Sequence, residues 1–383
     1  MPQTRLSGTI GTGLICLLLF FNLAWAAGNR TDHGWTDNQS MLLFYEALTT
    51  MENTALHPEP LQSMVHRAIE AAVRGNDPFA DFLSPQEFAA FQRSSSYAGQ
   101  AGVGMDIAED SSGNILCIPY PQGPAASAGV RYGDVLYRVD GREVAGMSVY
   151  VCGSLLRGPA GTTVRLDLHR AQGKRESRVI TREEIRFSSV YVHRLGGLQV
   201  ITILRFTPRT RDELKAVLTE QSPGTQGWIV DLRGNTGGDL FAAVDCAALF
   251  LPLGRTIIKV QTRADTQSFA VTRPPVDAST RLCLWQDGQT ASAAEVFVAA
   301  LTQNQRAVSL GRSSFGKGVT QRVVPLSDGS ALVVTYARLI PPNGRSFHRV
   351  GLDPTHKLTP AGGPLFEHDP YVQKTEEVFA RGF

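Results

Sequence analysis

Residues 281–303 read RLCLWQDGQTASAAEVFVAALTQ, in which a short apolar run is followed by a polar turn and an alanine-rich segment. The run from Arg281 to Trp285 predicts a buried strand, and Ala293 to Gln303 predicts a helix. Ser292 is therefore the last residue before that helix. A serine there is usually an N-cap, and Glu295, three residues on, also suits a capping box. The same position favours a nucleophile, because free backbone N–H groups and the helix dipole stabilise an oxyanion beside it.

Strands and helices alternate on both sides of this turn, from about residue 190 onward. Further strands are expected at 199–204, 228–232, 256–260, 307–310 and 331–336, and further helices at 211–220 and 239–250. This rhythm predicts an α/β (α+β) core with a mixed sheet and flanking helices over residues 187–370, and a C-terminal helix over 371–383. Reactive groups gather in such sheets where strands end and helices begin. A second candidate turn is DLRGNTGG at residues 231–238.

The preceding residues form two regions of different texture. Residues 36–97 are expected to be a helical region, because apolar residues recur there at helical spacing and Ser84-Pro85 resembles a helix start. Residues 98–186 contain short β-like runs separated by Gly, Asp and Pro turns, with one helix fitting 148–156. This second region is predicted to be a small β-rich module.

The N-terminus has the pattern of a signal peptide. Arg5 precedes an apolar run from Ile10 to Trp25, which ends in the small-x-small pattern Ala24-Trp25-Ala26. Cleavage after Ala26 is expected, so residues 1–26 would be removed and the protein exported to the periplasm or cell envelope. The alternative is an uncleaved membrane anchor.

Cysteine use leaves two readings open. Four cysteines follow the signal segment, namely Cys117, Cys152, Cys246 and Cys283. In an oxidising compartment they could pair within domains, as Cys117 with Cys152 and Cys246 with Cys283. The alternative is four buried free thiols.

Composition narrows the classes of function. The chain has 383 residues, 43% of them hydrophobic and 19% charged, which suits two or three packed domains. The formal net charge of +2 is too small to indicate nucleic acid as the main partner. The pattern H-E-x-x-H is absent, and no metal or cofactor is expected.

A serine hydroxyl needs a base before it can attack an amide, and Lys317 is the candidate. None of the eight histidines is an obvious base, and no G-x-S-x-G elbow occurs. Lys317 stands between Gly316 and Gly318, and burial can lower the pKa of a lysine by up to ~3–5 units. An ordinary surface charge is the alternative. The segment also resembles a phosphate-binding loop, but Gly318 replaces the Ser or Thr, and residues 319–326 are β-like instead of helical.

Two motifs together resemble the C-terminal processing peptidases, also called tail-specific proteases. The motifs are residues 290–295, TASAAE, and residues 315–321, FGKGVTQ. The resemblance implies that Ser292 is the nucleophile, Lys317 the base and Gln321 the residue that orients the lysine. The spacing of 25 residues between Ser292 and Lys317 also fits the family.

The turn at 231–238 resembles the D-L-R-x-N-x-G-G loop of the same family. This implies an oxyanion hole formed by the N–H of Ala293 and the N–H of Gly237 or Gly238. Residues 77–88, DPFADFLSPQEF, resemble a further family segment, D-P-H-S-x-Y-L-x-P-E-E-F. The chain departs from the family pattern at several positions: Gln289, Thr290 and Ala294 near the nucleophile, and Phe79 and Ala80 in place of the His and Ser.

The β-rich module resembles a PDZ domain. Its carboxylate-binding loop would be Gly102, Val103, Gly104 and Met105, and GPAASAGV and GDVL match the turns of that fold. A PDZ groove adds a peptide as an extra strand and holds its terminal carboxylate on backbone N–H groups. Arg157 resembles the family's arginine that links the PDZ domain to the catalytic core; a solvated surface charge is its alternative.

These features predict an exported serine endopeptidase that cleaves cell-envelope proteins recognised by their C-terminal tails. The expected partners are polypeptides with exposed C-termini, while an envelope adaptor protein and a homo-oligomer are left open. A catalytically silent PDZ-containing scaffold that only binds peptides is the main alternative. A small-molecule acyl hydrolase that uses the same dyad is a second one.

Overall fold

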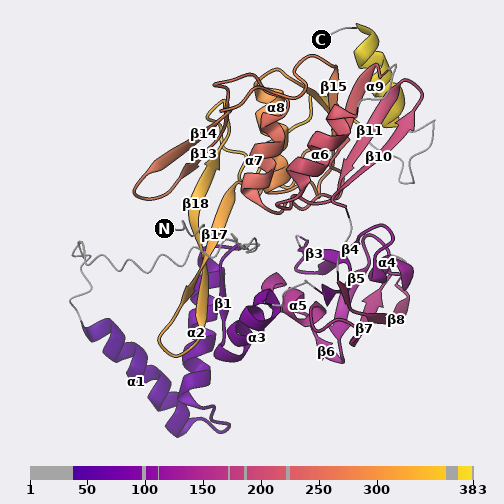
Figure 1. The fold of residues 1–383 in the computed structure, drawn as a ribbon. Helices are drawn as coiled ribbons and strands as arrows, with labels where there is room; N and C mark the ends of the chain where they lie inside the picture. The colour runs from indigo at the N-terminus through magenta and orange to yellow at the C-terminus, as the bar shows by residue number, and fades with distance from the viewer. Residues whose placement is uncertain are drawn as a thin grey trace, which may run out of the picture.

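The structure is a computed structural model that describes residues 38–96, 101–110, 112–170, 173–184, 188–220, 225–358 and 370–381. The predicted signal peptide lies outside the described residues. Figure 1 shows a core built on two sheets, a smaller β-rich module beside it, and an N-terminal helical region. The predicted α/β core with a PDZ-like module and an N-terminal helical segment is confirmed.

The larger core sheet has the strand order β10-β11-β12-β15-β16-β19. Its members are β10 (Val190–Leu195), β11 (Leu198–Ile203), β12 (Gly227–Asp231), β15 (Leu282–Gln286), β16 (Val308–Gly311) and β19 (His356–Lys357). β10 is antiparallel to β11, and every other neighbouring pair is parallel. The parallel strands therefore all end at the edge where the two candidate turns lie.

Helices cover both faces of this sheet. Helices α6 (Thr210–Thr219), α7 (Leu240–Ala248) and α8 (Ala293–Gln303) pack on one face, and α9 (Pro370–Arg381) packs on the other. Successive side chains of a strand point to opposite faces, so both faces of β12 and β15 are apolar and buried. This explains the continuous apolar runs in the sequence.

The second core sheet brings the N-terminal region to the catalytic core. It has the order β1-β18-β13-β14, with β17 paired to β18. The strands are β1 (Asp81–Leu83), β13 (Thr256–Gln261), β14 (Thr266–Ala270), β17 (Val319–Pro325) and β18 (Ala331–Ile340). The three-residue strand β1 interrupts the region predicted as helical, because backbone pairing with β18 holds these residues extended.

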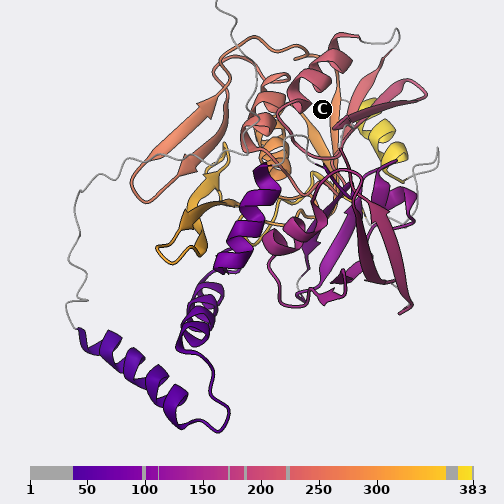
Figure 2. The same ribbon diagram turned by 60° about the horizontal axis from the view of Figure 1, so that its bottom comes forward.

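Three helices complete the N-terminal region: α1 (Asn38–Thr54), α2 (Leu61–Asn76) and α3 (Pro85–Ser96). Pro85 is the first residue of α3, as the sequence predicts. Figures 1 and 2 show α1 projecting away from the rest of the molecule. Among the described residues, no helix combines the length and apolar character needed to cross a membrane.

The β-rich module is an antiparallel sheet in the order β3-β4-β5-β7-β8, with β6 paired to β5. Its strands are β3 (Met105–Glu109), β4 (Ile115–Pro119), β5 (Val135–Val139), β6 (Arg142–Glu143), β7 (Thr163–His169) and β8 (Arg175–Thr181). It carries α4 (Pro124–Ser127) and α5 (Val149–Leu156), and α5 packs against β3. A short pair, β2 (Ala101–Gly102) with β9 (Glu183–Glu184), joins the two ends of the module.

All four described cysteines are buried free thiols, so neither of the two bridges considered from the sequence is present. Cys246 and Cys283 belong to apolar clusters on opposite faces of the larger sheet, which keeps their sulfurs apart. Cys117 and Cys152 lie together in the core of the β-rich module and are likewise free.

Candidate active site

Ser292 occupies the N-cap position of α8 with an unusual backbone. Its φ of 57° and ψ of −118° lie outside the extended region that N-caps ordinarily adopt. A residue other than glycine with positive φ is strained by about 1–3 kcal/mol, and such strain collects at functional sites. The side chain is partly exposed, whereas the next nine residues of α8 are buried. The strained turn therefore presents one hydroxyl at the surface of a rigid core.

A buried carboxylate joins this turn to the Lys317 loop. Glu295 Oε2 accepts hydrogen bonds from the backbone N–H of Ser292 at 2.9 Å and of Lys317 at 2.8 Å. Glu295 Oε1 accepts from the Ser314 hydroxyl at 2.5 Å and from the Gly316 N–H at 2.7 Å. Burial raises the pKa of Glu295 above its ordinary value, and the four hydrogen bonds oppose this shift without reversing it. Two sequence segments 25 residues apart thus share one acceptor group.

The Lys317 side chain lies in a partly apolar setting. Its Nζ is 5.6 Å from the centroid of the Phe79 ring. Burial lowers the pKa of Lys317, and the carboxylates of Asp77 and Glu295 oppose that shift by favouring the ammonium. A lowered pKa is what a lysine base requires. In the part of the chain that the structure describes, no hydrogen bond joins Lys317 Nζ to the Ser292 hydroxyl.

The glycine turn after β12 packs directly against Ser292. A Cβ added at Gly237 would lie 2.9 Å from Ser292 Cβ and 2.8 Å from the Ala291 carbonyl oxygen, and Gly237 has a φ of 106°. Only glycine tolerates this combination of contact and conformation. The turn is held by Asn235, whose backbone oxygen accepts from the Ala291 N–H at 3.0 Å.

The three predicted oxyanion donors differ in availability. The N–H of Gly237 already donates to Asn235 Oδ1 at 2.8 Å. Within the described residues, the N–H groups of Ala293 and Gly238 have no hydrogen-bond acceptor, and Gly238 is exposed. Ala293 directly follows Ser292, so its N–H is a donor free to bind an oxygen beside Ser292, and the free N–H of Gly238 lies one residue beyond Gly237, which packs against Ser292.

Gln321 lies on β17, close in sequence to Lys317 but bonded elsewhere. Its side-chain amide donates to Thr335 Oγ1 at 3.2 Å on the neighbouring strand β18. No hydrogen bond between Gln321 and Lys317 occurs among the described residues. The structure therefore places Gln321 a few residues after Lys317 but without the predicted contact that would orient the lysine.

The β-rich module contacts the glycine turn at two points. On β3, Asp106 forms an ion pair with Arg205, and its other oxygen accepts from the Thr236 hydroxyl at 3.3 Å. Tyr132 reaches the same turn, since its Cε2 would lie 3.3 Å from a Cβ at Gly234. Strand β3 is thus in direct contact with the turn that carries the free N–H of Gly238.

Arg157 lies at this boundary, beside the predicted carboxylate-binding loop. Its Cγ would be 3.9 Å from a Cβ at Gly102. Burial lowers the pKa of Arg157, as does the charge of Arg205, whereas Asp106 raises it. The predicted carboxylate-binding loop packs closely at Gly104, which has a φ of 67° and lies against Pro124. Gly102, Val103 and Gly104 are buried, and Met105 begins β3.

Sequence reasoning singled out Glu295 only as a helix cap and did not single out Asp106, Asn235 or Phe79 as site residues. The spacing of Glu295 from Ser292 was the available signal, but its contacts with Ser314 and Gly316 depend on the tertiary fold.

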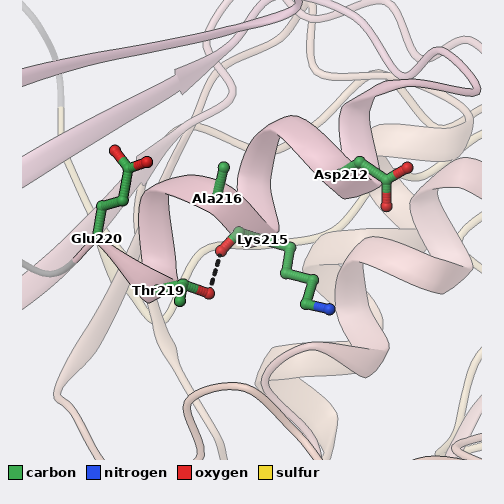
Figure 3. Close-up of a pocket in the computed structure, with 5 residues that line it drawn as sticks. All are labelled: Asp212, Lys215, Ala216, Thr219 and Glu220. Atoms are coloured by element: carbon green, nitrogen blue, oxygen red, sulfur yellow. Dashed lines mark hydrogen bonds between the residues drawn. The ribbon is translucent and has the colours of Figure 1, made fainter.

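A separate hollow over α6 (Figure 3) is lined by Asp212, Lys215, Ala216, Thr219 and Glu220 and contains none of the predicted site residues.

The chain is similar to several known proteins. The model of Peptidase family S41 matches residues 197–358, and the model of a PDZ domain matches residues 119–170. The chain is 30% identical over 333 residues to the "C-terminal processing peptidase, chloroplastic" of Tetradesmus obliquus, covering 81% of this chain and 72% of that protein. It is 31% identical over 306 residues to the "Carboxy-terminal processing protease CtpA" of Bacillus subtilis (strain 168), covering 76% and 64%.

A solved structure agrees. The photosystem II D1 C-terminal processing protease superposes with a TM-score of 0.66 at 29% identity, over 84% of this chain and 93% of that one. Fold and site together therefore define a serine-type peptidase that carries a PDZ domain. The chain belongs to the C-terminal processing peptidases of peptidase family S41, which confirms the resemblance seen in the sequence.

Proposed function

We propose that this protein is an exported endopeptidase with a Ser292/Lys317 dyad that cleaves envelope polypeptides recognised by their C-terminal tails. The main observation in favour of the dyad is the position of the Glu295 carboxylate, which accepts hydrogen bonds from the backbone N–H groups of both Ser292 and Lys317. The partial exposure of Ser292, the lowered pKa of Lys317, the free N–H of Ala293 next to Ser292 and the free N–H of Gly238 in the adjoining turn support the same assignment.

The chemistry follows from these positions. The neutral amine of Lys317 removes the proton from Ser292, whose Oγ forms a bond to the scissile carbonyl carbon. The carbonyl electron pair moves to oxygen, and the N–H groups of Ala293 and Gly238 stabilise that oxyanion, each by roughly 2.7–4 kcal/mol. The C–N bond then breaks, and the leaving amine takes the proton from the Lys317 ammonium. Water next hydrolyses the acyl-enzyme in the same two stages.

Among the described residues no hydrogen bond joins the Lys317 amine to the Ser292 hydroxyl, so the amine must move toward the hydroxyl before proton transfer. Such hydrogen bonds are often long in free enzymes and tighten with substrate. The decisive test is cleavage of casein and of an internally quenched peptide by the mature protein and by Ser292→Ala and Lys317→Ala. We expect each variant to lose at least ~10³-fold in kcat/KM. Wild-type rates in either variant would remove the dyad, and binding of tailed peptides without any cleavage by the wild type would favour the silent scaffold.

The PDZ domain supplies the proposed substrate preference. A peptide added beside β3, with its carboxylate at residues 102–105, would lie next to Asp106. Since Asp106 contacts Arg205 and Thr236, a shift of β3 would be transmitted to the glycine turn that carries Gly238. We expect peptide binding to rearrange the contact of Asp106 with Arg205 and Thr236 and so to activate cleavage. Arg157 lies at the same boundary between the PDZ domain and the core.

The experiment compares a peptide ending in an apolar residue with the same peptide amidated at its C-terminus. The wild type should prefer the free carboxylate, and Asp106→Asn should reduce the ratio of the two kcat/KM values. Glu109→Gln is the matched control, because Glu109 is an exposed acid on the same strand. An unchanged ratio in Asp106→Asn would refute this coupling.

Export, an envelope location and partners are part of the same proposal. The N-terminal pattern of residues 1–26 supports export, and a periplasmic or envelope site supplies partly unfolded substrates with accessible C-termini. An adaptor protein and self-association are further proposed partners. Fractionation of cells that express the full chain, with mass spectrometry of the mature N-terminus, tests cleavage after Ala26.

A further inference from the structure

The segment between α2 and β1 forms one wall of the Lys317 site. Residues 77–80 make a tight turn, in which Asp77 Oδ1 accepts from the Phe79 N–H at 2.9 Å and the Asp77 carbonyl accepts from the Ala80 N–H at 3.0 Å. Immediately afterwards β1 pairs with β18, with Asp81 opposite Val333. The turn is therefore held in place by a strand of the N-terminal region that is part of the core sheet.

Phe79 lies between Lys317 and His348. The Phe79 ring centroid is 5.6 Å from Lys317 Nζ and 5.5 Å from the His348 ring centroid. The His348 backbone also contacts the base loop, because a Cβ at Gly318 would lie 2.9 Å from its nitrogen. Segments far apart in the sequence thus enclose the amine, and Phe79 supplies the apolar surface.

The charged groups around Lys317 explain why an apolar cover matters. Asp77 faces the amine from the N-terminal turn and Glu295 from α8, and both carboxylates favour the ammonium. The His348 ring lies close to the Phe79 ring, and burial lowers the pKa of His348, with a further contribution from Arg349. Water admitted beside the amine would add to the effect of the two carboxylates and keep Lys317 protonated.

We propose that Phe79 is a positioning residue for the base: its ring covers the Lys317 amine and excludes water, so that the N-terminal region completes the active site. This inference rests on the proposed role of Lys317. It also accounts for a departure of this chain from the family pattern, which has His where this chain has Phe79. An imidazole there would be polar and could itself carry charge, whereas the phenyl ring can only exclude water or attract the cation.

The first test is the pH dependence of kcat/KM for a tailed peptide. In Phe79→Ala, water reaches the amine, the pKa of Lys317 rises, and the acidic limb should move to higher pH by about one unit. This corresponds to an approximately tenfold lower kcat/KM below the limb, with KM little changed. Phe79→Leu keeps an apolar cover without a π face, so its limb should stay in place or move to lower pH. An acidic limb in Phe79→Ala that is unmoved or moves to lower pH would overturn the inference.

The second test needs no activity. In a Ser292→Ala background, the rate at which acetic anhydride acylates Lys317 is followed by mass spectrometry as a function of pH, with and without Phe79→Ala. The midpoint should rise in the Phe79 variant, and an unchanged midpoint would refute the cover. A raised labelling midpoint with an unmoved activity limb would show that the ring covers an amine that is not the base, so the positioning role of Phe79 and the role of Lys317 as the base would both fail.

Controls separate this effect from a loss of folding. Phe79 is only partly buried, so Phe79→Ala should retain most of the wild-type thermal stability. Leu56→Ala removes an 88% exposed apolar side chain from the N-terminal region. It should change neither the acidic limb of kcat/KM nor the midpoint of Lys317 labelling. If Phe79→Ala does not fold, Phe79→Gln places a polar side chain at the same position and is held to the same outcomes.

Discussion

Replacing Glu295 with glutamine tests the group that holds the Ser292 and Lys317 backbones together. Both carboxylate oxygens act only as acceptors, and together they receive one hydroxyl and three backbone N–H groups. Glutamine has nearly the same shape but offers one oxygen and one NH2 group. In the more favourable of the two amide orientations, the glutamine oxygen still accepts the hydrogen bonds from the Ser292 and Lys317 N–H groups. The NH2 group then faces the Ser314 hydroxyl, which can turn to accept, and the Gly316 N–H, which cannot.

The magnitude follows from this count. One buried donor left unpaired costs about 1–3 kcal/mol, and two hydrogen bonds reduced from charged to neutral lose about 1 kcal/mol each. The variant should therefore lose about 3–5 kcal/mol of local stabilisation. If roughly 2.7 kcal/mol of this falls on the transition state, kcat/KM drops about 100-fold, since 1.36 kcal/mol corresponds to a factor of ten.

The pH profile of kcat/KM distinguishes the loss of the Glu295 charge from a simple loosening of the Ser292 and Lys317 segments. In the proposed mechanism Lys317 acts as a neutral amine, so activity should appear as the pH rises through the pKa of Lys317. The charge of Glu295 raises that pKa. Removing the charge should therefore lower the plateau of kcat/KM and also move the acidic limb to lower pH.

Steady-state cleavage of a quenched peptide between pH 5 and 10, at a temperature well below unfolding, measures both effects. Glu220→Gln is the matched control, because Glu220 is exposed at the end of α6, away from the site. A Glu295→Gln plateau within about twofold of wild type, or a limb that stays or moves to higher pH, would refute the bridging role.

Three further outcomes are expected. Gly237→Ala should lower kcat/KM at least ~10-fold with a smaller effect on peptide affinity, because its Cβ would collide with Ser292; equal activity would show that the turn can shift. Native protein should react slowly with Ellman's reagent at the four described thiols and quickly once unfolded, because burial raises the pKa of Cys117, Cys152 and Cys283 to about 12. Fast labelling of the native protein would contradict their burial. Arg233→Ala should lower the free energy of unfolding by about 2–4 kcal/mol in urea titrations, since Arg233 pairs with Asp231 and lies over the rings of Trp285 and Tyr371; a change below about 0.5 kcal/mol would be contrary to that packing.

Much of the fold was readable from local patterns. The expected helix 293–303 has the observed bounds, and the expected strand 307–310 lies one residue from β16, because buried strands and helices carry strong periodic signals and ended here at glycine or polar turns. The strands β3, β10 and β14 were not predicted. After the buried Val190, β10 alternates between partly buried and exposed residues, β14 is mostly exposed, and β3 has no fully buried residue, so their apolar signal is weak.

Sequence alone determined the class of chemistry, because three short motifs indicated a serine, a lysine and a glycine turn. Tertiary structure decided how they are assembled. It placed Glu295 between the two motifs, brought Phe79 of the N-terminal region over an amine 238 positions later (317 − 79), and kept four cysteines as separate thiols. The physical reason is range: backbone propensity acts over a few residues, whereas these contacts exist only after β1 pairs with β18 and the sheets have packed.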